Sequence, residues 1–150
     1  MNNLTPVRLS GLFGRDTDYS VGSDKTHTVG TRKEHWVWAI ACDLTCSAVV
    51  GNRVLRVQHR SGAGAILWQG PTSPVATAGQ TISLYMGVGE TYHTVQRRGP
   101  SDVAPTSSIS MGMPPLYMIQ GDYVRIYDAA AVDAAGDEIN YCIYYQELVK

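Results

Sequence analysis

The sequence lacks an excess of charge of either sign. Its 150 residues carry 12 lysines and arginines against 13 aspartates and glutamates, and charged residues make up only 17% of the chain. Such a balance provides no field for gripping nucleic acid phosphates or anionic lipid. We therefore expect neither nucleic acid nor a membrane among the partners. A net charge near zero also suits a protein that packs against neighbours.

Long apolar runs are missing as well. No stretch approaches the roughly 20 residues of a membrane-spanning helix, and the first residues lack the continuous apolar segment of a secretory signal. We expect a soluble protein that folds in a cytoplasm. The three cysteines, an odd number, argue against a disulfide framework and predict buried thiols at Cys42, Cys46 and Cys142.

Patterns that carry chemistry are scarce. No histidine has metal-binding spacing, and the histidines are His27, His35, His59 and His93. No serine lies in a nucleophile elbow, no histidine neighbours Cys42 or Cys46, and the glycines form no phosphate-binding loop. We therefore predict no catalytic residue, no metal site and no cofactor, and expect that the chain is not an enzyme. A sandwich hydrolase with two carboxylates from distant strands stays open as an alternative.

One acidic segment suggests a calcium loop at first sight, since it holds Asp128, Asp133, Asp137 and Glu138. The alternating aspartate order of an EF-hand loop is missing, and the intervening alanines supply no side-chain oxygen. We interpret the segment as a solvated acidic turn.

Alternation with a period of two residues is abundant. From Glu34 onward, one predicted face carries Trp36, Trp38, Ile40, Cys42 and Leu44, and the other carries Val37, Ala39 and Ala41. Both faces are apolar, which indicates a central strand. The turn at Gly51-Asn52 and the half-solvated run 52–59 then predict a hairpin with the tryptophans in the core.

Further alternating runs predict short strands at 65–69, 80–88, 116–119, 123–127 and 138–149. The last run could also be helical, but its β-branched and aromatic residues favour a strand. Residues 89–115 indicate a long connection with at most one or two short strands. About eight strands separated by turn signals predict an all-β fold, an antiparallel β-sandwich of the jelly-roll or immunoglobulin type.

The first 30 residues show no period and are rich in glycine and polar residues. We predict an extended N-terminal arm at 1–30 and one β-sandwich domain at 31–150. The arm is either a loosely docked terminus or a strap that reaches over a neighbouring subunit.

Nine tyrosines against one phenylalanine is a skewed ratio. Tyrosine combines wide apolar contact with a hydroxyl that tolerates water, which suits interfaces, although the tyrosines could equally line sheet surfaces. The pair Arg97-Arg98 is either a solvated loop or a contact to an acidic neighbour. The predicted interface residues are Leu4, Val7, Leu9, Leu12, Phe13, Tyr85, Tyr92, Arg97, Arg98 and Tyr117.

Two segments resemble a group of small virion proteins of tailed bacteriophages. Residues 35–58, HWVWAIACDLTCSAVVGNRVLRVQ, are similar to the group's tryptophan-containing strand and Gly-Asn-Arg turn. Residues 114–147, PPLYMIQGDYVRIYDAAAVDAAGDEINYCIYYQE, are similar to its proline-led strand, Gly-Asp turn, Tyr-Asp-x-Ala-x-Val-Asp segment and closing strand. Together they cover over a third of the chain. Cys46 stands where the group has serine, and residues 1–30 and 89–115 have no counterpart.

The resemblance implies a jelly-roll-like sandwich in a virion, without catalytic residues. It implies a head decoration or cement protein, assembled in the host cytoplasm as a homo-oligomer, with a trimer favoured, and bound to the major capsid protein or other virion proteins. A tail, neck or fibre-base component is the alternative within the virion. A carbohydrate-binding sandwich for host attachment, with exposed Trp or Tyr as sugar platforms, is the alternative of another class.

Overall fold

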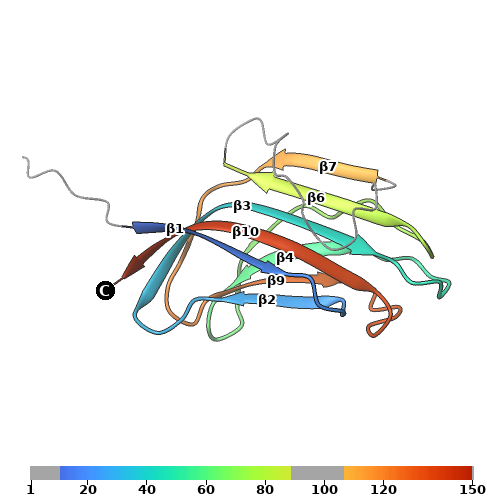
Figure 1. The fold of residues 1–150 in the computed structure, drawn as a ribbon, viewed down its shortest axis with the longest axis horizontal. Coiled ribbons are helices and arrows are strands. Elements are labelled where there is room, and N and C mark those ends of the chain that lie inside the picture. Colours follow the sequence, from blue (N-terminus) through green and yellow to red (C-terminus); the bar gives the residue numbers. More distant parts are fainter. Residues whose placement is uncertain (1–10, 89–106, 150) are drawn as a thin grey trace, which may run out of the picture.

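The computed structural model describes residues 11–88 and 107–149, which fold into ten strands and no helix (Figure 1). In these ranges no helix is long and apolar enough to cross a membrane. The prediction of an all-β fold is confirmed. The strands are β1 (Gly11–Asp18), β2 (Asp24–Thr28), β3 (Lys33–Thr45), β4 (Leu55–Arg60), β5 (Ile66–Gln69), β6 (Thr81–Gly87), β7 (Ser107–Gly112), β8 (Leu116–Met118), β9 (Tyr123–Asp128) and β10 (Glu138–Val149).

Two sheets enclose one core. The six-stranded sheet has the order β1-β10-β3-β6-β7, with β8 also paired to β3, and the four-stranded sheet has the order β2-β9-β4-β5. Strands β6 and β8 both pair with β3 on the side away from β10. If β6, β7 and β8 are counted together as the sixth strand, β9 becomes the seventh strand and β10 the eighth. The strand orders are then 1-8-3-6 and 2-7-4-5, as in an eight-stranded jelly roll. The predicted jelly-roll-like sandwich is confirmed, except that β7 pairs with β6 in parallel.

Alternate apolar side chains fill the space between the sheets. On the later strands the buried side chains of the alternating runs are Ile82, Leu84, Met86, Val124, Ile126, Ile139, Tyr141 and Ile143. Val88 and Tyr145, which continue two of these runs, are half-buried. Burying a side chain of this size stabilises the fold by roughly 1.5–3 kcal/mol. The core therefore follows the two-residue period on β6, β9 and β10.

The predicted arm is wrong for its described part. Strand β1 pairs with β10 along its whole length, and β2 pairs with β9, so residues 11–28 supply an edge strand to each sheet. The sequence concealed these strands because their inward positions are polar, among them Asp16, Lys25 and His27. Residues 1–10 lie outside the described residues, and the sandwich begins well before residue 31.

The predicted hairpin between β3 and β4 is also wrong. Strand β3 lies in the six-stranded sheet and β4 in the four-stranded sheet, so the connection 46–54 crosses from one sheet to the other. Each strand has an apolar inward face, including Leu44 on β3 and Leu55 and Val57 on β4. These faces bury each other across the core, an arrangement that side-by-side pairing in one sheet would not give.

Candidate interaction surface

A β-bulge decides where the tryptophans lie. The register of β3 against β10 shifts once, and Trp38 is the residue of β3 left without a partner on β10. Such a bulge reverses which side chains face the core. Beyond the bulge Ile40 faces inward as predicted, but before it Val37 faces inward and is fully buried. Trp36 and Trp38 are therefore half-buried on the outer face, and their predicted place in the core is wrong.

Three aromatic side chains and one glutamine lie in line across this outer face. Phe13 of β1 lies opposite Gln146 of β10, Gln146 opposite Trp36 of β3, and Trp36 opposite Tyr117 of β8. The ring centroid of Trp36 is 4.9 Å from that of Tyr117 and 6.5 Å from that of Trp38. We call these five residues, Phe13, Trp36, Trp38, Tyr117 and Gln146, the aromatic row.

The aromatic row offers contact area to a partner. Phe13 is 82% exposed and Tyr117 42% exposed. A pocket of about 230 Å³ is lined by the other three members of the row, Trp36, Trp38 and Gln146, and by Leu148. Exposed apolar surface rimmed by polar groups marks sites where proteins or ligands bind. The row is therefore suited to binding by burial and stacking.

Two of the predicted interface residues, Phe13 and Tyr117, lie at the two ends of the aromatic row. Tyr85 of β6 lies on the same outer face but opposite Ala41, further along β3. Leu12 lies in β1 opposite Glu147, and nothing is described of its side chain. The others lie outside the described residues, and they are Leu4, Val7, Leu9, Tyr92, Arg97 and Arg98.

Sequence reasoning missed the outward position of the half-buried Trp36 and Trp38, and it missed Gln146, which is buried beside them. Alternation identifies a strand, but its assignment of faces holds only while the register is unbroken. Neither glycine nor proline marks the bulge in residues 36–40. No signal in the single sequence could have located it.

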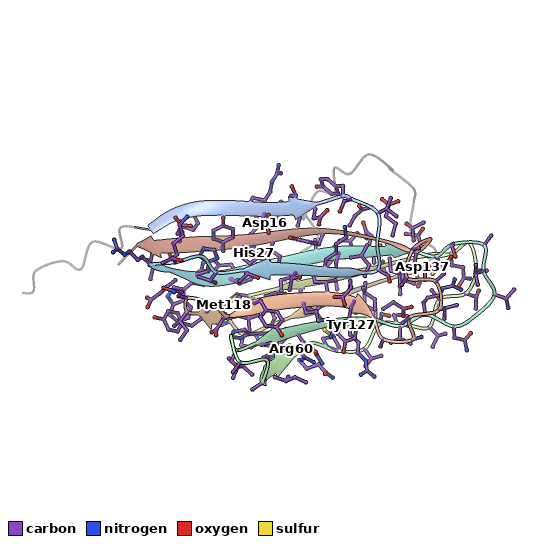
Figure 2. All side chains as sticks on the ribbon, turned by 90° about the horizontal axis from the view of Figure 1, so that it is seen from below. Asp16, His27, Arg60, Met118, Tyr127 and Asp137 are labelled. Carbon is purple, nitrogen blue, oxygen red and sulfur yellow. The ribbon has the colours of Figure 1, made fainter. Side chains whose placement is uncertain are left out.

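A second feature lies where β1 and β2 form adjacent edges of the two sheets (Figure 2). Asp16 Oδ2 is 2.6 Å from His27 Nδ1, His27 Nε2 is 3.0 Å from His35 Nδ1, and His35 Nε2 is 3.3 Å from Glu147 Oε2. We call these four residues the histidine chain. Two of the four histidines, His27 and His35, thus come together. Among the described residues, no group of three or more His, Cys, Asp or Glu side chains is placed to hold a metal ion.

The hydrolase alternative asks for two carboxylates that face each other in a cleft. Asp16 and Glu147 do line one pocket of about 330 Å³. However, His27 and His35 lie hydrogen-bonded between them. A hydrogen bond from Lys33 also lowers the pKa of Glu147, whereas a general acid of a glycosidase needs a raised pKa. The geometry does not favour this chemistry.

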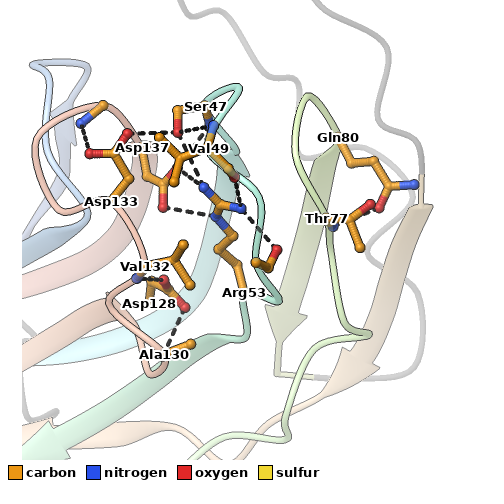
Figure 3. Close-up of polar contacts among 12 residues, drawn as sticks. Ser47, Val49, Arg53, Thr77, Gln80, Asp128, Ala130, Val132, Asp133 and Asp137 are labelled. Atoms are coloured by element: carbon orange, nitrogen blue, oxygen red, sulfur yellow. Dashed lines mark hydrogen bonds and ion pairs between the residues drawn. The ribbon is translucent and has the colours of Figure 1, made fainter.

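The prediction of a solvated acidic turn at 128–138 is right only in part, because residues 129–131 and 134–136 are exposed whereas Asp128 and Asp137 are buried. Asp137 is fully buried against the fully buried Arg53, and Asp128 is also buried (Figure 3). All five N–H groups of Arg53 have acceptors, namely both carboxylate oxygens of Asp137, Ser47 Oγ and the carbonyls of Val49 and Gly51. Burial alone would raise the pKa of Asp137, but hydrogen bonds from Arg53 and Ser47 hold it below its ordinary value. We call Ser47, Arg53, Asp133 and Asp137 the arginine cluster.

The arginine cluster joins the two segments that carry the virion-protein resemblance. Asp128 accepts a hydrogen bond from the backbone N–H of Val54 at 2.9 Å, and Asp133 accepts one from Ser47 Oγ at 2.7 Å. Gly51 has a φ of +155°, and a Cβ there would lie 2.6 Å from Val132 Cγ1. The Gly-Asn-Arg turn and the Tyr-Asp-x-Ala-x-Val-Asp segment therefore lock each other in place.

The cysteines are free and buried, as predicted. Burial raises the pKa of Cys46 to about 11, so its thiol stays protonated near neutral pH.

Comparison of the chain with protein-family models, with curated proteins and with solved structures found no match. The class that the fold defines is a β-sandwich of jelly-roll strand order with an aromatic outer face.

Proposed function

We propose that this chain is a non-enzymatic structural protein of a tailed-phage virion, which decorates or cements the capsid as a homo-oligomer. The observation that carries the proposal is the aromatic row on the outer face of the six-stranded sheet, in which Phe13 and Tyr117 are exposed. The sequence resemblance supplies the virion context. Jelly rolls occur in viral capsid and lectin domains, so the fold is compatible with this function but does not select it.

The proposed mechanism is burial of aromatic surface between the subunit and its neighbours. Partners are further copies of the chain, with a trimer favoured, and the major capsid protein or other virion proteins. Attachment at many lattice points lets modest single contacts add up through effective concentration. The chain would be assembled in the host cytoplasm and reside in the virion, and its near-zero net charge suits packing against other subunits.

Particles made without the protein, and particles carrying Trp36→Ala, test the proposal. Loss of the packaged genome at lower temperature or after milder osmotic shock is expected in both cases. Val75→Ala serves as the control, since Val75 is 56% exposed and is not part of the aromatic row. Unchanged particle stability in the absence of the protein would rule out a cement role.

A tail, neck or fibre-base position is separated from a capsid position by copy number. A decoration protein should reach hundreds of copies per particle, whereas a tail component should number a dozen or so. Quantifying the chain against the major capsid protein in purified particles decides between these positions.

Carbohydrate binding for host attachment is a second candidate function, favoured by the outward position of Trp36 and Trp38. A sugar ring could stack on the aromatic row while the Gln146 amide supplies hydrogen bonds. Titration of the chain with host-surface glycans, followed by tryptophan fluorescence, tests this function. Saturable binding that Trp36→Ala abolishes would support it, and the absence of binding to any host glycan would remove it.

A further inference from the structure

We infer that Asp16, His27, His35 and Glu147 form a proton-binding site. This site closes the seam between β1 and β2 only when it holds one proton in addition to the two that neutral histidines carry. The four residues come from four strands, β1, β2, β3 and β10. Strand β2 belongs to the four-stranded sheet and the other three to the six-stranded sheet. The site therefore bridges the two sheets at their edges.

The inference follows from counting protons. The histidine chain has three contacts, Asp16–His27, His27–His35 and His35–Glu147. Each contact needs one hydrogen between its two atoms. A carboxylate only accepts, and a neutral imidazole carries one N–H. Two neutral histidines thus supply two hydrogens for three contacts. One contact lacks its hydrogen bond unless the site takes up one further proton.

The neighbouring groups place that proton on the histidines. Lys33 Nζ lies 3.0 Å from Glu147 Oε2, and this contact, with His35, lowers the pKa of Glu147. The hydroxyl of Tyr141 donates to Asp16 Oδ2 at 2.9 Å. Burial and the contact with Asp16 raise the pKa of Tyr141, so it remains a donor. Each carboxylate thus also contacts a donor outside the two rings, Tyr141 for Asp16 and Lys33 for Glu147.

A second additional proton would interrupt the hydrogen bonds of the histidine chain at its centre. With both rings charged, two N–H groups would face each other across the 3.0 Å contact between His27 and His35. Burial and the facing His27 lower the pKa of His35, which opposes this state. Two arrangements satisfy all three contacts, because either ring can be the charged one if the neutral ring keeps its proton on the nitrogen that faces its carboxylate. The lowered pKa of His35 favours a charged His27 and a neutral His35 whose proton is on Nε2.

Burial makes each missing hydrogen bond costly. His27 and His35 are 6% and 5% exposed, and the ring of Tyr145 stacks on His35 at 4.1 Å. The terminal carboxylates reach solvent, since Asp16 is 37% and Glu147 17% exposed. Protons can thus enter from the ends, and a hydrogen bond lost between the two buried rings is costly. The remaining charged contact at this seam joins Asp18 of β1 to Lys25 of β2 at 3.1 Å.

Nitrogen NMR of the imidazole rings in the full chain tests the count. Three of the four ring nitrogens of His27 and His35 should carry a proton, and His35 Nδ1 should be the bare one. The protection of the β1 amides against hydrogen exchange, taken relative to the intrinsic rate at each pH, should be greatest at the pH where three of these nitrogens carry a proton. Loss of one buried hydrogen bond predicts a roughly twofold to tenfold fall in β1 protection on either side. Two or four protonated nitrogens at the pH of greatest protection would overturn the inference.

Variants supply a second test. His27→Gln should remove the pH dependence of β1 protection. His59→Gln, which changes the buried histidine of β4 that lies 3.5 Å from Asp122, should retain it. Asp16→Asn keeps both rings and tests the site even if His27→Gln fails to fold. Because Asn removes the negative charge beside His27, the alkaline loss of protection should begin at lower pH. An unmoved alkaline limb in Asp16→Asn would contradict the assignment.

Discussion

The arginine cluster and the histidine chain both join strands through buried polar groups, but they differ in how their charges are fixed. Arg53 and Asp137 are both fully buried and meet through two hydrogen bonds, so both remain charged across the ordinary pH range. In the histidine chain the connecting groups are imidazoles, whose ring nitrogens can each be bare or protonated. The charges of the arginine cluster are therefore permanent, whereas the contacts of the histidine chain depend on one additional proton.

This difference corresponds to position in the fold. The arginine cluster fixes the crossing from β3 to β4 and the turn before β10, on which the core depends (Figure 3). The histidine chain fastens β1 and β2, which are edge strands (Figure 2). An edge can open while the core remains folded. Conditional charge is therefore tolerated at the seam and would be destabilising at the crossing.

Asp137→Ala should have the largest effect. It leaves the Arg53 guanidinium buried without its carboxylate, which costs about 3–5 kcal/mol in comparable buried pairs. Urea unfolding of the variant against the unchanged protein measures the loss. Asp24→Ala is the matched control, because it removes an exposed Arg125 pair and should cost about 1 kcal/mol or less. Equal effects of the two variants would show that burial does not separate them.

Asp16→Asn should have an intermediate effect confined to the seam. It removes a charged acceptor shared by His27 and Tyr141, and hydrogen bonds to charged groups contribute about 1.5–3 kcal/mol. Amide exchange should increase in β1 and β2 and stay unchanged in β3 and β4. Faster exchange throughout the chain would mean that the seam is part of the same cooperative unit as the arginine cluster.

Lowering the pH should weaken the protein by a smaller amount, through His35. Its folded pKa lies below 6.5, so its contribution is present above that value and declines as the pH falls below it. The unfolded chain binds the proton more readily, which lowers the free energy of unfolding. The carboxylates Asp18, Asp137 and Glu147, whose pKa values are also lowered, add their losses only further into the acid range.

His59 must be separated from this effect, because burial lowers its pKa as well. Unfolding free energies between pH 7 and 5 should be measured for His35→Gln and His59→Gln. His35→Gln should flatten the profile while His59→Gln retains part of the slope. A profile unchanged by His35→Gln would place the acid sensitivity elsewhere in the molecule.

How far the sequence leads can be judged from particular residues. The alternation of Ile82, Leu84 and Met86 predicted β6 and its inward face, because a regular strand on a core leaves a period of two. The faces of Trp36 and Trp38 were assigned wrongly, because a bulge is a property of pairing between strands. Strand β1 was hidden because Asp16 faces inward, and an inward aspartate makes sense only beside His27.

The candidate sites follow the same logic. Phe13 and Tyr117 were predicted from residue type, but the row that joins them depends on the order β1-β10-β3 with β8 beside β3. Sequence reasoning predicted neither the arginine cluster nor the histidine chain. Asp137 lies 84 residues from Arg53, and Glu147 lies 112 residues from His35. Contacts at such separation leave no local spacing for sequence reasoning to recognise.

Phe13→Ala should have the smallest effect on folding and a large effect on binding. At 82% exposure the side chain contributes little to stability, so the free energy of unfolding should change by about 0.5 kcal/mol or less. The same truncation removes the end of the aromatic row, where attachment to a neighbouring subunit is proposed. Occupancy of the variant on purified particles, compared with that of Val75→Ala, measures this. Because Phe13 is carried by β1, occupancy should also decline at a pH where the histidine chain is incomplete, which links the conditional joint to the binding surface. Full occupancy of Phe13→Ala would exclude this end of the row from attachment.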